Sequence, residues 1–462
     1  MRKEKPSIVE RGPKHVLSLL DATAIIVGIV VGAGIFRLPS LVALNLGSDL
    51  AIMGAWLLGG VISFIGALCF AELMSSYADA GGEYHVLNRA FGRNVGFMFA
   101  WARMTVVQTG SIALLAYIFG DYGAGLLPLG PHGAAICAAA LIVLLTALNL
   151  SGIRETKGVQ NLLFALTLLG LLVVIVAGLS LDGAEDAGGA APSGGGLSGF
   201  GMAMVFVLLT YGGWNESAYI SAEIRGGPRR IVAALLLSIG VITLLYVAIN
   251  VAYLHGLGAA GMSRSSAVAG ELMAAAFGPV GEILMTVLVL LVVAASANVT
   301  ILTGARTNFA LGRDFALFNG LYHWDEARGA PSRALLLQGA IALGLVLLGA
   351  LNRKGIETVI DYLAPVFWFF FLLMGISVFV LRRRDPDRPR PFTVPLYPLT
   401  PLLFCLSSAS LLYSSLVYTG TGALVGVGVL LLGLPVLALA RRRQRRADDG
   451  ARPDRPIPVT QK

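Results

Sequence analysis

The stretch "GIVVGAGIFRLPS", residues 28–40, interrupts the first strongly apolar segment of the chain. Its three glycines are poor helix formers, and its proline cannot donate a backbone hydrogen bond. A second apolar segment is interrupted in the same way by "TYGGWNES", residues 210–217. Two segments long enough to be membrane-spanning helices therefore carry their weakest helix formers near their middle.

The composition indicates an integral membrane protein. Of the 462 residues, 56% are hydrophobic and 13% are charged, and the mean hydropathy is +0.79. These values lie outside the usual range of soluble domains. The three cysteines, Cys69, Cys137 and Cys405, each lie in an apolar segment, so their spacing supports neither a disulfide framework nor a metal site. We expect no cofactor and no metal.

Segments of about 20 apolar residues are long enough to cross a bilayer as helices. By this criterion the sequence predicts an all-α integral membrane protein with 12 transmembrane helices. The predicted spans are 17–45, 50–76, 94–120, 133–150, 158–181, 200–224, 230–254, 279–311, 332–351, 356–381, 396–418 and 421–440. The first and the sixth span contain the two interruptions, so both are predicted to be discontinuous helices.

The basic residues indicate the orientation. With the N-terminus in the cytoplasm, most of the 34 Lys and Arg residues fall in cytoplasmic segments, and the outer segments carry only Arg264, Arg353 and Lys354. Both termini are therefore predicted to be cytoplasmic, in a protein of the cell membrane. The runs "RRRDPDRPR" (382–390) and "RRRQRR" (441–446) could also bind nucleic acid or anionic lipid. We interpret them as stop-transfer anchors, with membrane lipid and not nucleic acid as partner.

An acidic, glycine-rich linker separates span 5 from span 6 and divides the chain into two halves. Interrupted helices at corresponding positions of two halves are typical of inverted-repeat transporters, whose binding site lies near the bilayer midplane. The predicted organisation is a cytoplasmic tail (1–16), a first repeat (17–181), an extracytoplasmic linker (182–199), a second repeat (200–381), a peripheral pair of spans (396–440) and a basic cytoplasmic tail (441–462).

Each interruption exposes backbone groups that hydrocarbon cannot satisfy and a bound ligand can. Amides at the start of a half-helix bind an anion, and carbonyls at the end of the preceding half attract a cation. An anion and a cation held a few ångströms apart describe an α-amino acid. The predicted substrate-binding residues are Val30, Gly32, Ala33, Gly34, Ile35, Thr210, Tyr211, Gly212, Gly213, Trp214 and Asn215. The alternative is close helix packing, since Gly28 and Gly32 form a GxxxG pair.

Charged residues inside spans are costly and are therefore functional candidates. Glu216 follows the second interruption, where its carboxylate could meet the substrate ammonium, pair with a basic residue, bind a proton or cap the next half-helix. Arg103 could face a water-filled inner vestibule. Arg37 could attract anionic groups into an outer vestibule, snorkel to the surface or form an ion pair. Glu223 and Arg225, at the end of the same span as Glu216, are predicted gate or interface residues.

Uncharged polar residues on spans 3 and 8 are further candidates for coupling or gating. They include Gln108, Ser296 and Asn298. At the depth predicted for them, each side chain could face the substrate or could hydrogen-bond a neighbouring helix. The sequence leaves both interpretations open.

Five motifs over roughly residues 15–440 together resemble the amino acid, polyamine and organocation permeases, in particular the L-type amino acid transporters and their bacterial relatives. They are "GAGIF" (32–36), "SYADAGGEYHVLNRAFG" (76–92), "YGGWNE" (211–216), "LTGARTNFALGRD" (302–314) and "RPRPFTVPLYP" (388–398). The resemblance implies a leucine-transporter-type fold, with spans 1–5 and 6–10 as 5+5 inverted repeats. It also implies transport of a free amino acid by alternating access.

One departure from the family pattern concerns coupling. Many relatives place a lysine about eight residues after the "VQ" that opens span 5, where its ammonium can stand in for a sodium ion. Here Thr167 occupies that position. Sodium is then the least favoured coupling ion, because a cation site in this region would rely on neutral oxygens alone.

These features favour a secondary transporter of neutral or apolar L-amino acids, acting as an exchanger or a proton-linked symporter. A cationic amino acid or polyamine carrier, or a nutrient receptor built on a transporter fold, is the alternative. An enzyme is not expected, because the sequence contains no nucleophile elbow, P-loop or cluster of His, Cys and acidic residues. The expected partners are an amino acid and membrane lipid, and the oligomeric state is left open.

The predicted orientation can be tested by cysteine labelling. In the variant Arg388→Cys, an impermeant maleimide added outside intact cells should label residue 388 only after the membrane is permeabilised, because the basic loop is predicted to be cytoplasmic. Strong labelling of intact cells would contradict the topology.

Overall fold

The computed structural model describes residues 16–32, 34–126, 129–130, 132–183, 196–265, 267–351, 354–419 and 421–450. Ala33, nearly all of the predicted N-terminal tail, most of the predicted linker 182–199 and the end of the C-terminal tail lie outside the described residues. Within these ranges the fold is all-α, and its only β contacts are two isolated bridges, Leu17 with Ile224 and Asp325 with Ala330.

The helices follow one another along the whole chain. They are α1 (Leu19–Val30), α2 (Gly34–Leu46), α3 (Asp49–Ser76), α4 (Glu83–Phe91), α5 (Arg93–Ala102), η1 (Arg103–Val107), α6 (Gln108–Leu126), α7 (Gly133–Ser151), α8 (Ile153–Ser180), α9 (Gly196–Thr210), η2 (Trp214–Glu216), α10 (Ser217–Ile220), η3 (Ser221–Glu223), α11 (Pro228–Arg264), α12 (Val268–Phe277), α13 (Pro279–Asp314), η4 (Ala316–Leu321), α14 (Ser332–Leu351), α15 (Lys354–Arg384), α16 (Leu399–Thr419) and α17 (Thr421–Gly450).

Among the described residues, eight helices are long and apolar enough to cross a membrane, and α1, α12 and part of α14 are shorter apolar helices. Many of these helices also expose large apolar side chains on their outer face, such as Leu169 and Val176 on α8. Water would disfavour such a surface, whereas lipid accepts it. The chain is therefore a multi-pass membrane protein.

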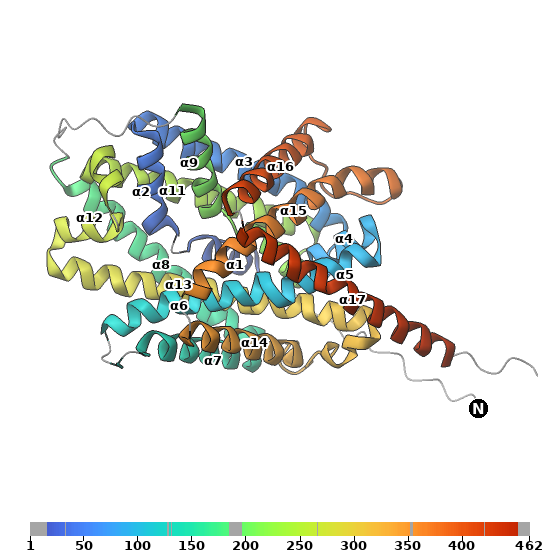
Figure 1. Cartoon of the computed structure of the whole chain (residues 1–462). Coiled ribbons are helices and arrows are strands. Elements are labelled where there is room, and N and C mark those ends of the chain that lie inside the picture. The colour runs from blue at the N-terminus through green and yellow to red at the C-terminus, as the bar shows by residue number, and fades with distance from the viewer. Residues whose placement is uncertain are drawn as a thin grey trace, which may run out of the picture.

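The first helix lies at the centre of the bundle (Figure 1). It packs against α8, α11 and α13, and most of its residues are buried. Its start is fixed by a capping box, in which Ser18 accepts from the Asp21 amide and Asp21 accepts from the Ser18 amide. This position places the end of α1 in the interior of the protein.

Both predicted interruptions are present as breaks between helices. The predicted span 17–45 consists of α1 and α2, separated at residues 31–33, and the predicted span 200–224 consists of α9 followed by the short turns η2, α10 and η3. Gly213 has a φ of 111°, a conformation that favours glycine. The glycines thus act where the sequence predicted, at two breaks in apolar helices.

Other elements differ from the predicted spans. The helices α4 and α12 were not predicted, because both are shorter than a bilayer-crossing segment. The segment predicted to end at residue 254 continues as α11 to Arg264, with a kink at Gly258, where φ is 65°. The last helix, α17, continues beyond the predicted end at residue 440 into the basic tail as far as Gly450.

Residues 103–107 form a short π-helix, η1, inside the predicted span 94–120. A π-helical turn adds a residue to the helix and rotates the side chains that follow. Arg103 at its start is buried, with 4% of its surface exposed. The irregular turn therefore coincides with a charged side chain in the interior.

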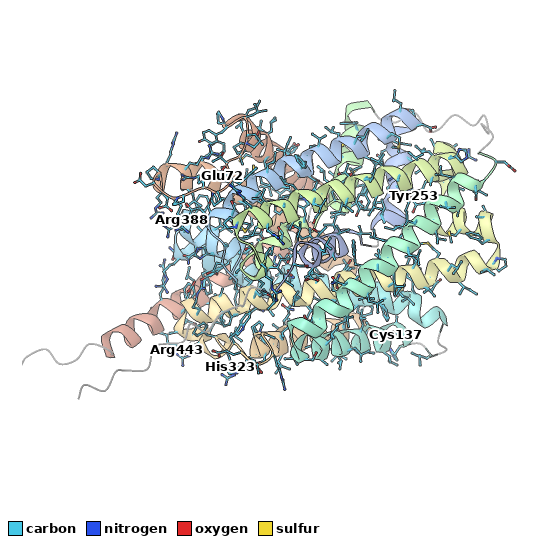
Figure 2. The ribbon with its side chains drawn as sticks, turned by 180° about the vertical axis from the view of Figure 1, so that it is seen from behind. Glu72, Cys137, Tyr253, His323, Arg388 and Arg443 are labelled. Atoms are coloured by element: carbon cyan, nitrogen blue, oxygen red, sulfur yellow. The ribbon has the colours of Figure 1, made fainter. Side chains whose placement is uncertain are left out.

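The two ends of the bundle differ in charge. Figure 2 shows Glu72, Arg388, Arg443 and His323 toward one end and Tyr253 and Cys137 toward the other. The basic segments predicted to be cytoplasmic thus lie at one end, which also carries α4 (Figure 1).

Candidate functional site

The two helix breaks meet each other. A Cβ atom added to Gly213 would lie 3.5 Å from the carbonyl oxygen of Ile29, next to the end of α1. A Cβ atom on Gly34 would lie 3.5 Å from the side chain of Thr210, at the end of α9. The ends of α1 and α9 and the start of α2 therefore surround one small region. Among the predicted substrate-binding residues, the structure brings together Val30, Gly34, Thr210 and Gly213.

One tyrosine hydroxyl joins the two breaks. Tyr246 on α11 is fully buried, and its hydroxyl lies 2.8 Å from the Val30 carbonyl oxygen and 3.0 Å from the Thr210 carbonyl oxygen. A hydroxyl has one proton and can donate fully to one acceptor at a time. Each carbonyl oxygen has two lone pairs, so it can accept a further donor beside this hydroxyl. Tyr246 was not identified from the sequence, because it occupies an ordinary position in a regular apolar segment.

The amides at the start of α2 are hydrogen-bond donors and complement the carbonyl acceptors of Val30 and Thr210. The first four amides of any helix have no partner within it, and those of Gly34 and Ile35 begin α2. The partial positive charge of a helix N-terminus favours an anion there. Gly32, which donates to the Val30 carbonyl at 2.8 Å, lies between the two sets of groups. The junction thus offers donors and acceptors close together, as a zwitterion requires.

A neutral polar network covers one side of the first break. Ser296 on α13 donates to the Gly28 carbonyl at 3.0 Å. The Asn298 amide donates to Gln160 at 2.9 Å and accepts from Asn149 at 2.9 Å. Gln160 lies against α1, since a Cβ atom on Gly28 would approach its Nε2 to 2.4 Å. Ser296 is thus at the break, and Asn298 supports it through Gln160.

Three other predicted candidates contact neighbouring helices that contain neither break. Tyr211 donates its hydroxyl to the Trp56 carbonyl on α3 at 3.1 Å, and Trp214 packs edge-on against Phe70 at 5.0 Å. Gln108 donates to the Thr300 carbonyl on α13 at 2.7 Å. Thr167 is buried in α8, where its hydroxyl has no hydrogen-bond partner among the described residues. The contacts of Tyr211, Trp214 and Gln108 are those of helix packing, an alternative that the sequence left open for Gln108.

The remaining predicted residues lie at the breaks themselves. Ile35 is buried in the first turn of α2, and the Gly212 amide donates to the Leu209 carbonyl at 3.2 Å. Ala33 lies outside the described residues, as does the side chain of Arg37.

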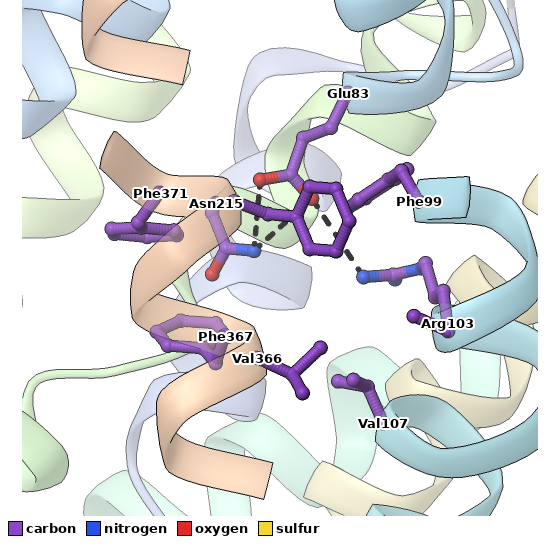
Figure 3. Close-up of a pocket in the computed structure, with 10 residues that line it drawn as sticks. Glu83, Phe99, Arg103, Val107, Asn215, Val366, Phe367 and Phe371 are labelled. Atoms are coloured by element: carbon purple, nitrogen blue, oxygen red, sulfur yellow. Dashed lines mark hydrogen bonds and ion pairs between the residues drawn. The ribbon is translucent and has the colours of Figure 1, made fainter. Parts of the chain in front are cut away.

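Immediately after the second break lies a buried cluster of charged groups. Nη2 of Arg103 is 2.5 Å from Oε2 of Glu216, and its Nη1 is 3.7 Å from Oε2 of Glu83. The Tyr219 hydroxyl donates to Glu83 at 2.6 Å, and Asn215 donates to both oxygens of Glu83 at 3.4 Å. Figure 3 shows Glu83 between Asn215 and Arg103. Glu216 therefore pairs with a basic residue, which is one of the alternatives predicted for it.

The structure corrects one interpretation of this cluster and adds a residue to it. Glu216 does not cap the following half-helix, because α10 has no side-chain hydrogen bond at its N-terminus and the carboxylate turns instead to Arg103. Glu83 was not singled out from the sequence, since it lies in a segment predicted to be a loop. Burial raises the pKa of Glu83 to about 7, against the opposing effect of Arg103.

Two cavities lie on opposite sides of the breaks. The first is lined by Glu83, Arg103, Asn215 and aromatic residues of α15, and its volume of about 20 Å³ suits roughly one water molecule. The second has a volume of about 500 Å³ and lies between Phe36 on α2, the end of α6, α12 and the start of α13. Of these two cavities, the one on the α12 side has the volume for a small solute.

Ion pairs and backbone bonds close the α4 side. Buried Arg306 on α13 bonds Glu223 at 2.5 Å, and the amides of Val16 and Leu17 donate to the Glu223 carbonyl at 2.9 Å. The Arg225 amide donates to the Leu17 carbonyl at 2.8 Å. The end of the predicted sixth span is thus bonded to α13 and to the segment preceding α1.

The chain is similar in sequence to known proteins. Residues 17–438 match the family model described as amino acid permease. The chain is 29% identical over 438 residues to the b(0,+)-type amino acid transporter 1 of Homo sapiens, covering 90% of this chain and 86% of that protein. It is 30% identical over 439 residues to the large neutral amino acids transporter small subunit 2 of Mus musculus, covering 92% and 81%.

The conformation at Gly213 can be tested by substitution. In Gly213→Ala, a side chain must occupy a φ of 111°, which costs about 1–3 kcal/mol where the backbone is held in place. We expect binding of L-leucine to the purified protein, measured by scintillation proximity, to fall more than tenfold. Gly240→Ala in α11 is the control, because the new Cβ atom meets open space. Binding by Gly213→Ala within threefold of the unmodified protein would show that the break is not at the site.

The bridging hydroxyl gives a second test. Tyr246→Phe leaves at least one buried carbonyl without its donor, a loss of about 1–3 kcal/mol. We expect a lower thermal unfolding temperature and an approximately tenfold weaker apparent affinity for L-leucine. Tyr117→Phe is the matched control, since its hydroxyl also donates to a buried carbonyl, that of Val346, but away from the breaks. Equal losses of affinity in both variants would contradict a role of Tyr246 at the site.

Proposed function

Because the chain belongs to the amino acid permease family, we propose that it is a secondary transporter of neutral or apolar L-amino acids that works by alternating access. The observation that carries the proposal is the junction of the two breaks, where one buried hydroxyl bridges the carbonyls of Val30 and Thr210. Transport takes the form of exchange or of proton-linked symport across the cell membrane.

The amino acid would bind along the junction. Its carboxylate would accept from the amides at Gly34 and Ile35, with the N-terminus of α2 behind them. Its ammonium would donate to the second lone pairs of the Val30 and Thr210 carbonyls, beside the Tyr246 hydroxyl. Backbone groups of this kind recognise the part that all amino acids share, so side-chain selectivity must come from the walls of the site.

The charges near the junction favour a neutral substrate side chain. Glu216 is the carboxylate closest in sequence to the second break, and Arg103 already pairs with it. The other carboxylate of the cluster, Glu83, receives hydrogen bonds from Tyr219 and Asn215. A cationic substrate side chain would therefore meet carboxylates that already have partners. The printed name of the mouse relative, which refers to large neutral amino acids, supports the same class.

A carrier of cationic amino acids or polyamines is the second candidate. The larger cavity is lined by the carboxyl groups of Asp121, Glu271 and Glu282, and a vestibule of one sign of charge raises the local concentration of oppositely charged solutes. Because these groups line the approach and not the junction, they affect entry more than binding.

In the proposed membrane orientation, the α4 end faces the cytoplasm and the 500 Å³ cavity faces outward. The structure then corresponds to a conformation closed toward the cytoplasm by Glu223 and Arg306. Spans 1–5 and 6–10 would form the two inverted repeats, and opening the α4 end would require the end of the broken sixth span to separate from α13.

Transport by reconstituted protein tests the function. Proteoliposomes loaded with unlabelled L-leucine should take up radiolabelled L-leucine at least tenfold faster than empty liposomes, and an excess of L-arginine or putrescine outside should compete weakly. Imposed proton and sodium gradients then separate symport from exchange. Strong competition by L-arginine or putrescine, with no exchange of L-leucine, would replace the proposal with the cationic carrier.

A further inference from the structure

The buried cluster beside the second break has an unbalanced formal charge. It contains one guanidinium, Arg103, and two carboxyl groups, Glu83 and Glu216, which are exposed by only 4%, 2% and 8%. If both carboxyl groups were ionised, the cluster would carry one uncompensated negative charge in a membrane protein's interior. Such a charge is costly unless it is paired or neutralised by a proton.

The distances show which carboxyl group interacts more strongly with Arg103. Glu216 lies 2.5 Å from Nη2, the distance of a charge-assisted hydrogen bond, whereas Glu83 lies 3.7 Å from Nη1, beyond direct hydrogen bonding. Arg103 therefore balances the charge of Glu216, and the excess negative charge falls on Glu83.

The neighbours of Glu83 suit both of its protonation states. The Tyr219 hydroxyl and the Asn215 amide donate to the ionised carboxylate. Oδ1 of Asn215 is buried without a hydrogen-bond partner among the described residues, so a rotated amide can accept a hydrogen bond from the carboxylic acid instead. The adjoining cavity of about 20 Å³ has room for roughly one water molecule, which could transfer the proton.

The polar groups that contact Glu83 come from three elements, η1, η2 and α10. Arg103 and Glu216 face it from η1 and η2, and Tyr219 faces it from α10. The face of α15 against the cavity consists of Val366, Phe367, Phe370 and Phe371. The charged groups that follow on α13 and α15 are directed to other partners: Arg313 to Asp79, Asp314 to Tyr84, and Arg384 to the carbonyls of Arg89 and Ala90.

We propose that Glu83, Arg103 and Glu216 form a binding site for a single proton, that Glu83 is the group that carries it, and that the proton is held while the α4 end is closed and released when this end opens. The proposal rests on the proposed function, because it assumes alternating access. It assigns the proton to Glu83 and not to Glu216, which makes the shorter contact with Arg103.

The position of the cluster connects the proton to the gate. Glu83 is the first residue of α4, whereas Asn215 and Glu216 belong to η2, directly after the break at Gly213. Separation of α4 from η2 would bring water to Glu83, and water stabilises the ionised form. Protonation therefore favours the closed arrangement, and loss of the proton favours the open one.

The proton can be observed without any transport. Infrared difference spectra of the purified protein between about pH 6 and pH 8 should show a carboxylic acid C=O band that disappears near pH 7. The band should be absent from Glu83→Gln. Glu72→Gln is the matched control, because Glu72 is an equally buried carboxyl group with its own partner, Arg382, at 2.5 Å. A band that persists unchanged in Glu83→Gln would overturn the assignment.

Two further variants predict shifts in opposite directions. In Glu216→Gln, Arg103 is freed to pair with Glu83, so the titration should move to a pH lower by at least about one unit. In Tyr219→Phe, Glu83 loses a donor that favours its ionised form, so the titration should move to higher pH, while the ring over Arg103 is retained. Unchanged titrations in both variants would contradict the shared site, even if Glu83→Gln failed to fold.

Exchange of L-leucine, measured with equal pH on both sides of the proteoliposome membrane, links the proton to transport. The rate should rise as the pH increases through about 7 in the unmodified protein and should become independent of pH in Glu83→Gln. An unaltered pH profile in Glu83→Gln would overturn the link. Absence of exchange by the unmodified protein, with the infrared band present, would instead contradict the proposed function and leave the proton site standing.

Discussion

The structure depends on one constraint: a helix that is broken inside a membrane must find partners for its backbone groups. Water and lipid cannot supply them in the hydrocarbon region, so the partners must come from the protein or from a ligand. Here the carbonyls at the ends of α1 and α9 converge on the hydroxyl of Tyr246, and the Gly28 carbonyl receives Ser296. The lone pairs that remain on the Val30 and Thr210 carbonyls define a place for a ligand's ammonium.

A second constraint is that buried charge must be compensated. Three of the arginines discussed above, Arg103, Arg306 and Arg382, each bond a buried glutamate, and each joins two elements that are distant in the sequence. In the shortest contacts, Arg306 pairs with the single carboxylate of Glu223 and Arg382 with that of Glu72. Arg103 differs, because two glutamates approach it from η2 and α4. A change in the proton content of that cluster therefore alters the attraction between α4 and the broken sixth span.

The sequence predicts the breaks well because their cause is local. Glycines with unfavourable helix propensity mark both positions, and no distant residue is needed to recognise them. The side chains that bond the backbone at the breaks cannot be recognised in the same way. Tyr246 lies 36 residues after Thr210 in the chain, and only the packing of α11 brings its hydroxyl to both carbonyls. Its importance follows from the fold and has no signature in the neighbouring residues.

Side-chain direction was the other feature that the sequence could not determine. Tyr211 and Trp214 lie beside the paired glycines, so a role in the substrate pocket was a reasonable prediction. In the structure, Gly59 and Gly66 on α3 leave the space that these two rings occupy, because a Cβ atom at either position would lie within 3.4 Å of them. The position of the Tyr211 and Trp214 rings against α3 thus depends on glycines of another helix. Glu83 was overlooked for a related reason, since α4 is too short and too polar to be detected as a buried helix.

The proposed substrate site and the charged cluster are close together along the chain. Thr210, whose carbonyl faces the proposed ammonium position, precedes Glu216 by a single irregular turn that pivots at Gly213. Residues 214–216 form one 3₁₀ turn, so a displacement of Glu216 relative to Arg103 cannot leave the backbone at Gly213 unchanged. A ligand at the junction and a proton on the cluster therefore act on the same segment, which can be held against α4 or released from it. Coupling between two sites requires an element whose equilibrium both ligands bias, and the turn between the break and the cluster has the position to be that element.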